Sequence, residues 1–182
     1  MNLRQLRWPV VLASLAVTLA GLFGAGRLVR SQTVDQPLLT ALSGLDGLSS
    51  YQVVQVGTVP EVEVHPAPGS NLREVYTEVD RQVRVILRGG QYEIKVTGNP
   101  TAELEQVAER LILFVHEAVA TGAFSAMADR IADEAAAAGA EAHMAVDEQR
   151  VYLTVRQGDA CAYRVVERPA RPAAPAGGGI VP

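Results

Sequence analysis

The chain has 182 residues, 48% of them hydrophobic, with 16 basic and 20 acidic side chains and a formal net charge of −4. Because an ordinary domain holds about 100 to 150 residues, this length accommodates one domain with an anchor and a tail and excludes a second large core. Four of the basic residues flank an apolar segment near the amino terminus, which leaves 12 basic against 20 acidic residues elsewhere, a balance that argues against nucleic acid as a partner.

The segment from Trp8 to Gly26 contains no charged residue. A helix of this length, at about 1.5 Å per residue, spans the roughly 30 Å hydrocarbon core of a bilayer. Basic residues lie on both sides of it, at Arg4, Arg7, Arg27 and Arg30. The sequence therefore predicts an amino-terminal transmembrane helix within residues 1–30. It would cross the cell membrane once, with the amino terminus inside and the following domain outside the cytoplasm.

A cleaved signal peptide is the alternative for this segment. Arg4 and Arg7 would form its basic region, and Gly24-Ala25-Gly26 offers small residues to a peptidase. The apolar stretch is longer than the about 7 to 15 residues usual in a signal peptide, which favours an uncleaved anchor. Cleavage would turn the same domain into a secreted soluble protein.

Two segments flank the central region of the chain. Residues 31–50 carry Leu38, Leu42 and Leu45 at helical spacing, which predicts a juxtamembrane connector with a short helix or a packed loop. Residues 168–182 hold four prolines and a run of three glycines. Such a composition buries too little apolar surface to offset the entropy of ordering, so we expect a disordered tail there.

The central region begins with strand patterns followed by an amphipathic helix. Tyr51–Val56 and Val59–His65 are rich in valine and predict one broken strand or two short ones. Asn71 with Glu74 predicts a helix N-cap, and apolar residues recur on one helical stripe from there to Gly89.

A strand and two further helices come next. Tyr92–Val96 alternates apolar and polar side chains, which is typical of a strand with one buried face. Asn99-Pro100 predicts the N-cap and first turn of a second helix that Gly122 would end. Ser125 predicts the cap of a third helix, with Gly139 at its end.

Three strand-like runs close the region, at residues 142–146, 150–156 and 160–166. Residues suited to tight turns join them, so the pattern predicts a three-stranded antiparallel meander. Together, the helix and strand patterns predict an α+β domain over residues 51–167. In this domain, a mostly antiparallel sheet of four or five strands packs against two or three helices.

No motif for catalysis or metal binding stands out. His116 precedes Glu117 on a predicted helix, but a zinc-protease signature needs a second histidine four residues on, and that residue is Ala120. The single cysteine, Cys161, cannot form an internal disulfide, and its place in a strand pattern predicts an inert buried thiol. We expect no catalytic residue, no metal and no cofactor.

Tyrosine and arginine side chains gather on the predicted C-terminal strands. The candidate interface residues are Arg150, Tyr152, Arg156, Tyr163 and Arg164. A sheet face of this composition is typical of a protein interface. An ordinary solvated face, with the apolar stems of arginine lying over tyrosine, is the alternative interpretation.

These patterns favour a non-enzymatic module of the cell envelope. Residues 8–26 would hold it in the membrane, and its domain would bind another envelope protein or a copy of itself. One alternative is an enzyme or small-ligand receptor whose site is assembled from residues distant in the sequence. The other is the secreted protein that signal cleavage would release.

Overall fold

The computed structural model describes residues 36–56 and 59–169. The expected membrane anchor lies outside the described residues, and so does the expected tail beyond residue 169. In the part of the chain that the structure describes, no helix is both long and apolar enough to cross a membrane.

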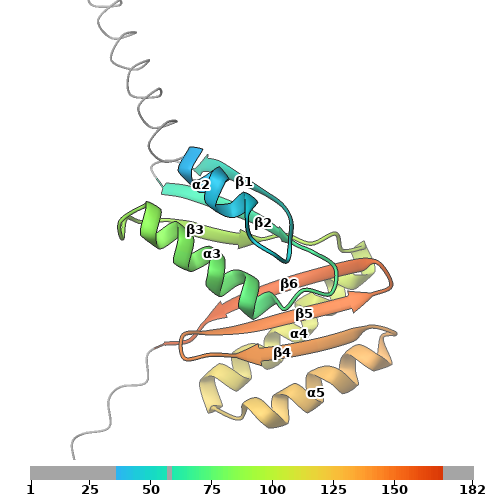
Figure 1. Ribbon diagram of the computed structural model, residues 1–182. Coiled ribbons are helices and arrows are strands. Elements are labelled where there is room, and N and C mark those ends of the chain that lie inside the picture. The colour runs from blue at the N-terminus through green and yellow to red at the C-terminus, as the bar shows by residue number, and fades with distance from the viewer. Residues whose placement is uncertain (1–35, 57–58, 170–182) are drawn as a thin grey trace, which may run out of the picture.

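The described residues form an α+β fold, as expected, with four helices and two three-stranded sheets (Figure 1). The elements are α2 (Gln36–Ser43), β1 (Leu48–Val56), β2 (Val59–Pro66), α3 (Leu72–Ile86), β3 (Glu93–Val96), α4 (Ala102–Thr121), α5 (Phe124–Ala137), β4 (Glu141–Val146), β5 (Arg150–Gln157) and β6 (Ala160–Glu167). The expectation of a single sheet of four or five strands is therefore wrong. Hydrophobic alternation identifies strands, but it does not say which strands share a sheet.

The amino-terminal half, α2 to β3, contains a sheet of order β1-β2-β3. Strands β1 and β2 form an antiparallel hairpin, so the expected broken strand is in fact two paired strands. Strand β3 joins β2 in parallel after the crossover helix α3. Helices α2 and α3 cover one face of this sheet, where Leu38, Leu42, Val62, Val79 and Val83 are buried. Part of the expected connector thus packs into the core.

The carboxy-terminal half, α4 to β6, contains the sheet of order β4-β5-β6. Both strand pairs are antiparallel, which confirms the predicted meander. Helices α4 and α5 cover one face of this sheet, and their buried residues include Leu104, Leu111 and Ile131. Val151 and Leu153 of β5 meet them there.

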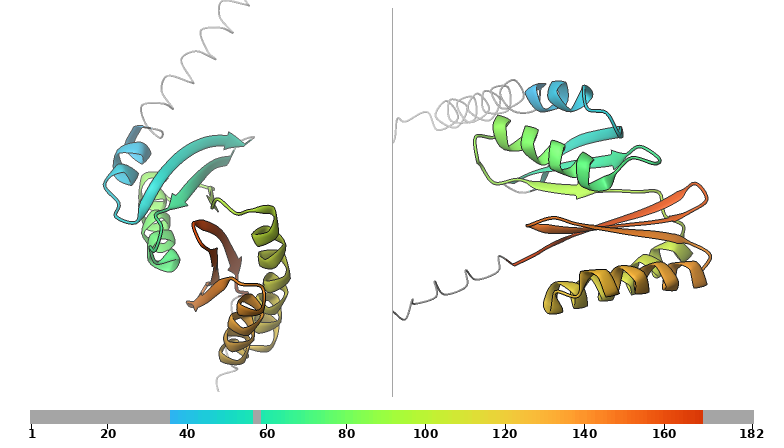
Figure 2. Two further views of the ribbon diagram at one scale, coloured as in Figure 1. Left: turned by 90° about the vertical axis from the view of Figure 1, so that its right-hand side faces the viewer. Right: turned by 60° about the horizontal axis from the view of Figure 1, so that its bottom comes forward.

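The two halves meet through the other face of the second sheet. Leu72 and Tyr76 of α3 pack against Tyr152, Cys161 and Tyr163 of β5 and β6. The rings of Tyr76 and Tyr152 lie 5.7 Å apart, edge to face, a favoured geometry for an aromatic pair. Figure 2 shows the second sheet between α3 on one side and α4 and α5 on the other.

Helix capping agrees with the sequence at one helix and differs at two. The Asn71 side chain accepts hydrogen bonds from the backbone N–H groups of Arg73 and Glu74, so the predicted cap of α3 is confirmed. Helix α4 is capped by Thr101, which accepts from Leu104 N at 3.2 Å, and the prediction of Asn99 is wrong.

The Asn99 side chain instead forms hydrogen bonds at the start of strand β6. Its Nδ2 donates to the Asp159 carbonyl at 3.0 Å, and its Oδ1 accepts from the Cys161 N–H at 3.1 Å. The predicted cap of α5 is also wrong, because this helix begins at Phe124, before Ser125, and has no side-chain cap. At α4, a contact with a segment about 60 residues away thus replaces the capping role that the local pattern predicted for Asn99.

Candidate functional site

The five candidate interface residues do not share one exposed face. Tyr152 and Tyr163 are buried between the halves, with 1% and 6% of their surfaces exposed. Arg164 lies on the opposite side of β6, where its guanidinium binds Glu105 and Glu109 of α4. Since successive residues of a strand point to opposite faces, Tyr163 and Arg164 could not have lain together.

Arg150 belongs to a polar cluster that joins the two halves. Its Nη1 lies 3.7 Å from Oδ2 of the buried Asp80 in α3, and its guanidinium carbon lies 4.9 Å from the Tyr76 ring centroid. Asp80 also accepts hydrogen bonds from Tyr92 at 2.7 Å and from Arg84 at 2.8 Å. The carboxylate of Asp80 is therefore bound by partners within the fold.

A second part of this junction is the turn between β4 and β5. Asp147 accepts hydrogen bonds from Gln149 N and Arg150 N and from the Tyr152 hydroxyl, which lies 2.7 Å away. Burial would raise the pKa of Asp147, but these hydrogen bonds outweigh it and the pKa is lowered. Burial, helped by the bond to Asp147, raises the pKa of Tyr152 to about 12. Tyr152 is thus a neutral structural residue.

Arg156 lines an open cavity, which the buried Tyr152 also borders. This cavity has a volume of about 350 Å³ and lies where the loop before α3 meets the outer part of the second sheet. We call it the junction cleft and define it by Ser70, Asn71, Arg73, His143, Thr154 and Arg156. Helix α3 covers the face of β5 and β6 but leaves this strip beside β4 open.

The junction cleft is positive in an otherwise acidic protein. Among the described residues that line it, none is Asp or Glu. Arg73 and Arg156 form no ion pair with any described residue, whereas Arg84 and Arg164 each bind a carboxylate. Glu141 lies opposite Arg156 in the strand register, yet no ion pair joins them. The cleft therefore holds two guanidinium groups that have no carboxylate partner among the described residues.

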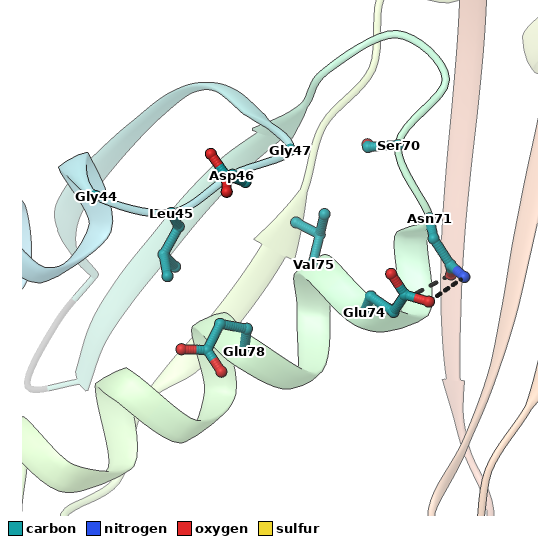
Figure 3. A pocket seen from close by; sticks show the side chains of 9 residues that line it. All are labelled: Gly44, Leu45, Asp46, Gly47, Ser70, Asn71, Glu74, Val75 and Glu78. Carbon is teal, nitrogen blue, oxygen red and sulfur yellow. Dashed lines mark hydrogen bonds between the residues drawn. The ribbon is translucent and has the colours of Figure 1, made fainter.

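A larger cavity, of about 460 Å³, lies between the α2–β1 loop and α3 (Figure 3). Three carboxylates line it, from Asp46, Glu74 and Glu78. Glu74 accepts from Asn71 Nδ2 at 2.9 Å and Glu78 accepts from Arg81 and Gln82, so both are engaged within α3. Figure 3 shows the three side chains pointing in different directions. This arrangement offers no convergent acidic site.

A third cavity, of about 280 Å³, lies at the other end of the junction and is lined by His65, Cys161 and Tyr163. Cys161 is only 6% exposed, which agrees with the prediction of a buried thiol. Burial raises the pKa of Tyr163 to about 12, so its hydroxyl stays protonated. Over residues 36–56 and 59–169, no group of three His, Cys, Asp or Glu side chains is placed to hold a metal ion.

The strand pattern indicates Arg156 as a candidate, but no pattern indicates Arg73, which lies in the first turn of α3. The register pairs His143 with Thr154, which places both on the same face of the β4–β5 pair as Arg156. The alternation of His143, Thr154 and Arg156 along predicted strands could have signalled this face. No local signal could have brought Arg73 to it. No protein-family model and no curated protein sequence matches the chain.

Proposed function

We propose that this chain is a single-pass membrane protein of the cell envelope whose domain is a non-enzymatic interaction module, and that its partner binds at the junction cleft. The observation that carries this proposal is the pair of guanidinium groups, Arg73 and Arg156, that line an open cleft without a carboxylate partner among the described residues. Interfaces are enriched in arginine, because its planar fork binds carboxylates with two hydrogen bonds.

The position of the cleft supports a macromolecular partner. Its lining comes from both halves, residues 69–73 and 143–156, and it lies beside β4, an outer strand of its sheet. A partner can therefore reach across the cleft and beyond the edge of the sheet. Residues 8–26 would hold the chain in the membrane, with the domain on the outer side.

Membrane attachment and orientation are tested by cysteine labelling in intact cells. In a Cys161→Ala background, a single cysteine replaces Ser31, and an impermeant thiol reagent is added from outside. Labelling together with a full-length mass supports the proposed anchor. Protection from the reagent reverses the orientation, and a mass that lacks the amino-terminal segment shows that the segment is cleaved.

The cleft is tested by photo-crosslinking in the same cells. A photoreactive residue replaces His143 in the cleft and, as a control, Leu113, which is 66% exposed on α4. We expect a discrete adduct from position 143 that is absent from position 113. Mass spectrometry then separates a partner protein from a second copy of the chain. Equal labelling from both positions, or none from position 143, contradicts the proposal.

A receptor for a small anionic ligand is the second candidate function. It is favoured by the assembly of the cleft from segments that lie about 70 positions apart in the sequence, as residues 73 and 143 do. Thermal unfolding of the purified full-length protein with inorganic phosphate or citrate distinguishes the two. A ligand that binds only the folded state raises the melting temperature, and such a rise without any adduct at position 143 favours the receptor.

A further inference from the structure

The edge strand β4 and the junction cleft lie side by side, and together they restrict what kind of partner fits. We infer that the partner segment is an extended stretch of polypeptide with acidic and apolar residues in alternation, which adds to the second sheet as a fourth strand next to β4. This inference rests on the proposed function, since it names the chemistry of the partner at the same cleft.

Strand β4 is an open edge without the usual protection. It is the outer strand of the order β4-β5-β6, and its register with β5 is regular from Glu141 to Val146, without a bulge. Its sequence, EAHMAV, contains no proline or lysine, and Glu141 at its start is its one charged residue. Natural proteins commonly block edge strands with such residues or with bulges. An edge that lacks them is suited to receive another strand.

The hydrogen bonding of the hairpin identifies which backbone groups are available. Asp147 N donates to Arg150 O at 3.0 Å, so these two residues form a hydrogen-bonded pair. Such pairs alternate along an antiparallel ladder, which places the backbone groups of His143 and Ala145 toward β5. The N–H and C=O groups of Ala142, Met144 and Val146 therefore point outward. They offer a strand of complementary register a ladder of main-chain hydrogen bonds.

The two faces beside this edge differ in character. On one face, His143 and Ala145 line the junction cleft together with Arg73 and Arg156. On the other face, Met144 and Val146 pack against the apolar core below α4 and α5. Side chains of an added strand alternate between the two faces. Carboxylates on the cleft side and apolar side chains on the other side complement the edge.

Two other features of the region do not carry the inference. The amino end of α3 is already capped, because Asn71 Oδ1 accepts from Arg73 N and Glu74 N. Two other long edge strands are described, β1 and β6. β1 has the sequence LSSYQVVQV without any charge, so nothing on it selects an acidic segment. Pairing through β1 or β6 is an outcome that the test below must distinguish.

The test measures peptide binding to the purified full-length protein by fluorescence anisotropy. The probe is a labelled peptide of roughly ten residues in which Glu alternates with Val, and its control has Lys in place of Glu. Two further versions of the acidic peptide carry N-methyl groups on every second backbone amide, in one register or in the other. We expect the acidic peptide to bind, the Lys peptide not to bind, and one methylated register to bind much more weakly than the other.

Charge reversal in the cleft gives the second arm. Arg73→Glu and Arg156→Glu are each expected to weaken binding of the acidic peptide by roughly tenfold, because each removes a charge-assisted contact and adds repulsion. The matched control is Arg110→Glu, an exposed arginine of α4 without an ion pair among the described residues. It is expected to change binding less than twofold or so. Circular dichroism verifies that each variant is folded.

The outcomes separate this inference from the proposed function. Acidic peptides that bind equally well in both methylated registers overturn strand addition, and equal weakening by all three Arg variants overturns the cleft as the place of binding. If no acidic peptide binds while the adduct at position 143 persists, the inference fails and the proposed interaction module stands. If the acidic peptide binds but the adduct at position 143 is missing, the inference about the acidic strand stands and the proposed function in the cell is contradicted. Should a cleft variant not fold, the methylated peptides decide the question with the unaltered protein.

Discussion

The two three-stranded sheets of this chain are covered differently, although their sequence patterns are alike. The first sheet is covered by α2 and α3 on one face only, and its other face carries polar side chains that include Gln52, Glu63 and Lys95. The second sheet is covered by α4 and α5 on one face and largely by α3 on the other. Alternation along a strand therefore shows that two faces differ, and it does not show which of them meets solvent.

Polar groups on the open face of the first sheet have different surroundings from those in the junction between the two halves. On the open face of the first sheet, Glu63 accepts from Thr97 at 2.7 Å and lies 3.8 Å from Lys95. These contacts, with the Thr97 hydrogen bond as the largest cause, lower the pKa of Glu63. Because the Lys95 side chain is 56% exposed, this ion pair contributes little to stability. In the junction, Asp80 and Arg150 are largely withdrawn from water, so losing either partner leaves a buried charge.

The largest effect is expected from Asp80→Ala. It removes the acceptor of Tyr92 and Arg84 and leaves the buried guanidinium of Arg150 without its carboxylate. We expect a loss of about 3 to 5 kcal/mol in the free energy of unfolding, measured by urea denaturation of the full-length protein in detergent. Glu61→Gln, beside Lys95 on the open face of the first sheet, is the control and should cost less than about 1 kcal/mol. Equal effects would remove the distinction between the two faces.

Next in size is Gly98→Ala at the connection between the halves. A Cβ atom at this position would lie 2.1 Å from the carbonyl oxygen of Cys161, so the backbone of β6 or of the connection must move. A forced fit of this kind costs about 1 to 3 kcal/mol. Gly44→Ala is the matched control, because its Cβ would approach no atom closer than 4.0 Å. Thermal melts that do not differ would mean that the halves do not approach each other at Gly98.

Asn99→Ala tests the link between the connection and β6. It removes two hydrogen bonds, to the Asp159 carbonyl and from the Cys161 N–H, and should cost about 1 to 2 kcal/mol. Hydrogen exchange should become faster at the amide of Cys161. Thr101→Ala, which removes the α4 cap, should accelerate exchange at Leu104 instead. If Asn99→Ala instead accelerated exchange at Leu104, Asn99 would be the helix cap.

The smallest effect is expected from Tyr152→Phe, and it depends on pH. The pKa of Tyr152 is about 12 in the fold against about 10 in an unfolded chain, so its contribution is complete below about pH 10 and is lost as the pH rises toward 12. At neutral pH the variant loses the hydrogen bond to Asp147, at a cost of about 1 kcal/mol. Urea denaturation between pH 9 and 12 should show a shallower decline for the variant. An unchanged slope would argue against burial of Tyr152.

Local sequence patterns predict most helices and strands of this chain, but not which of them pack together. The α3 stripe with its Asn71 cap and the meander of β4 to β6 follow from contacts within a few residues, and both are found in the structure. The failures at Asn99 and Ser125 involve helix ends, where a competing partner or a turn overrides a local preference. The pattern of tyrosine and arginine did not reveal that Tyr152 and Tyr163 are buried against α3 of the other half of the chain.

The sequence by itself determined the α+β class, the main helices and strands, and the acidic balance of the domain, because hydrophobic periodicity, turn residues and charge are local properties. Only the tertiary structure decided that the strands form two sheets, that α3 covers the tyrosine face, and that Arg73 reaches the same cleft as Arg156. These arrangements depend on contacts between segments far apart in the chain. Burial of apolar surface drives such contacts without direction, so only the packed fold selects which faces meet.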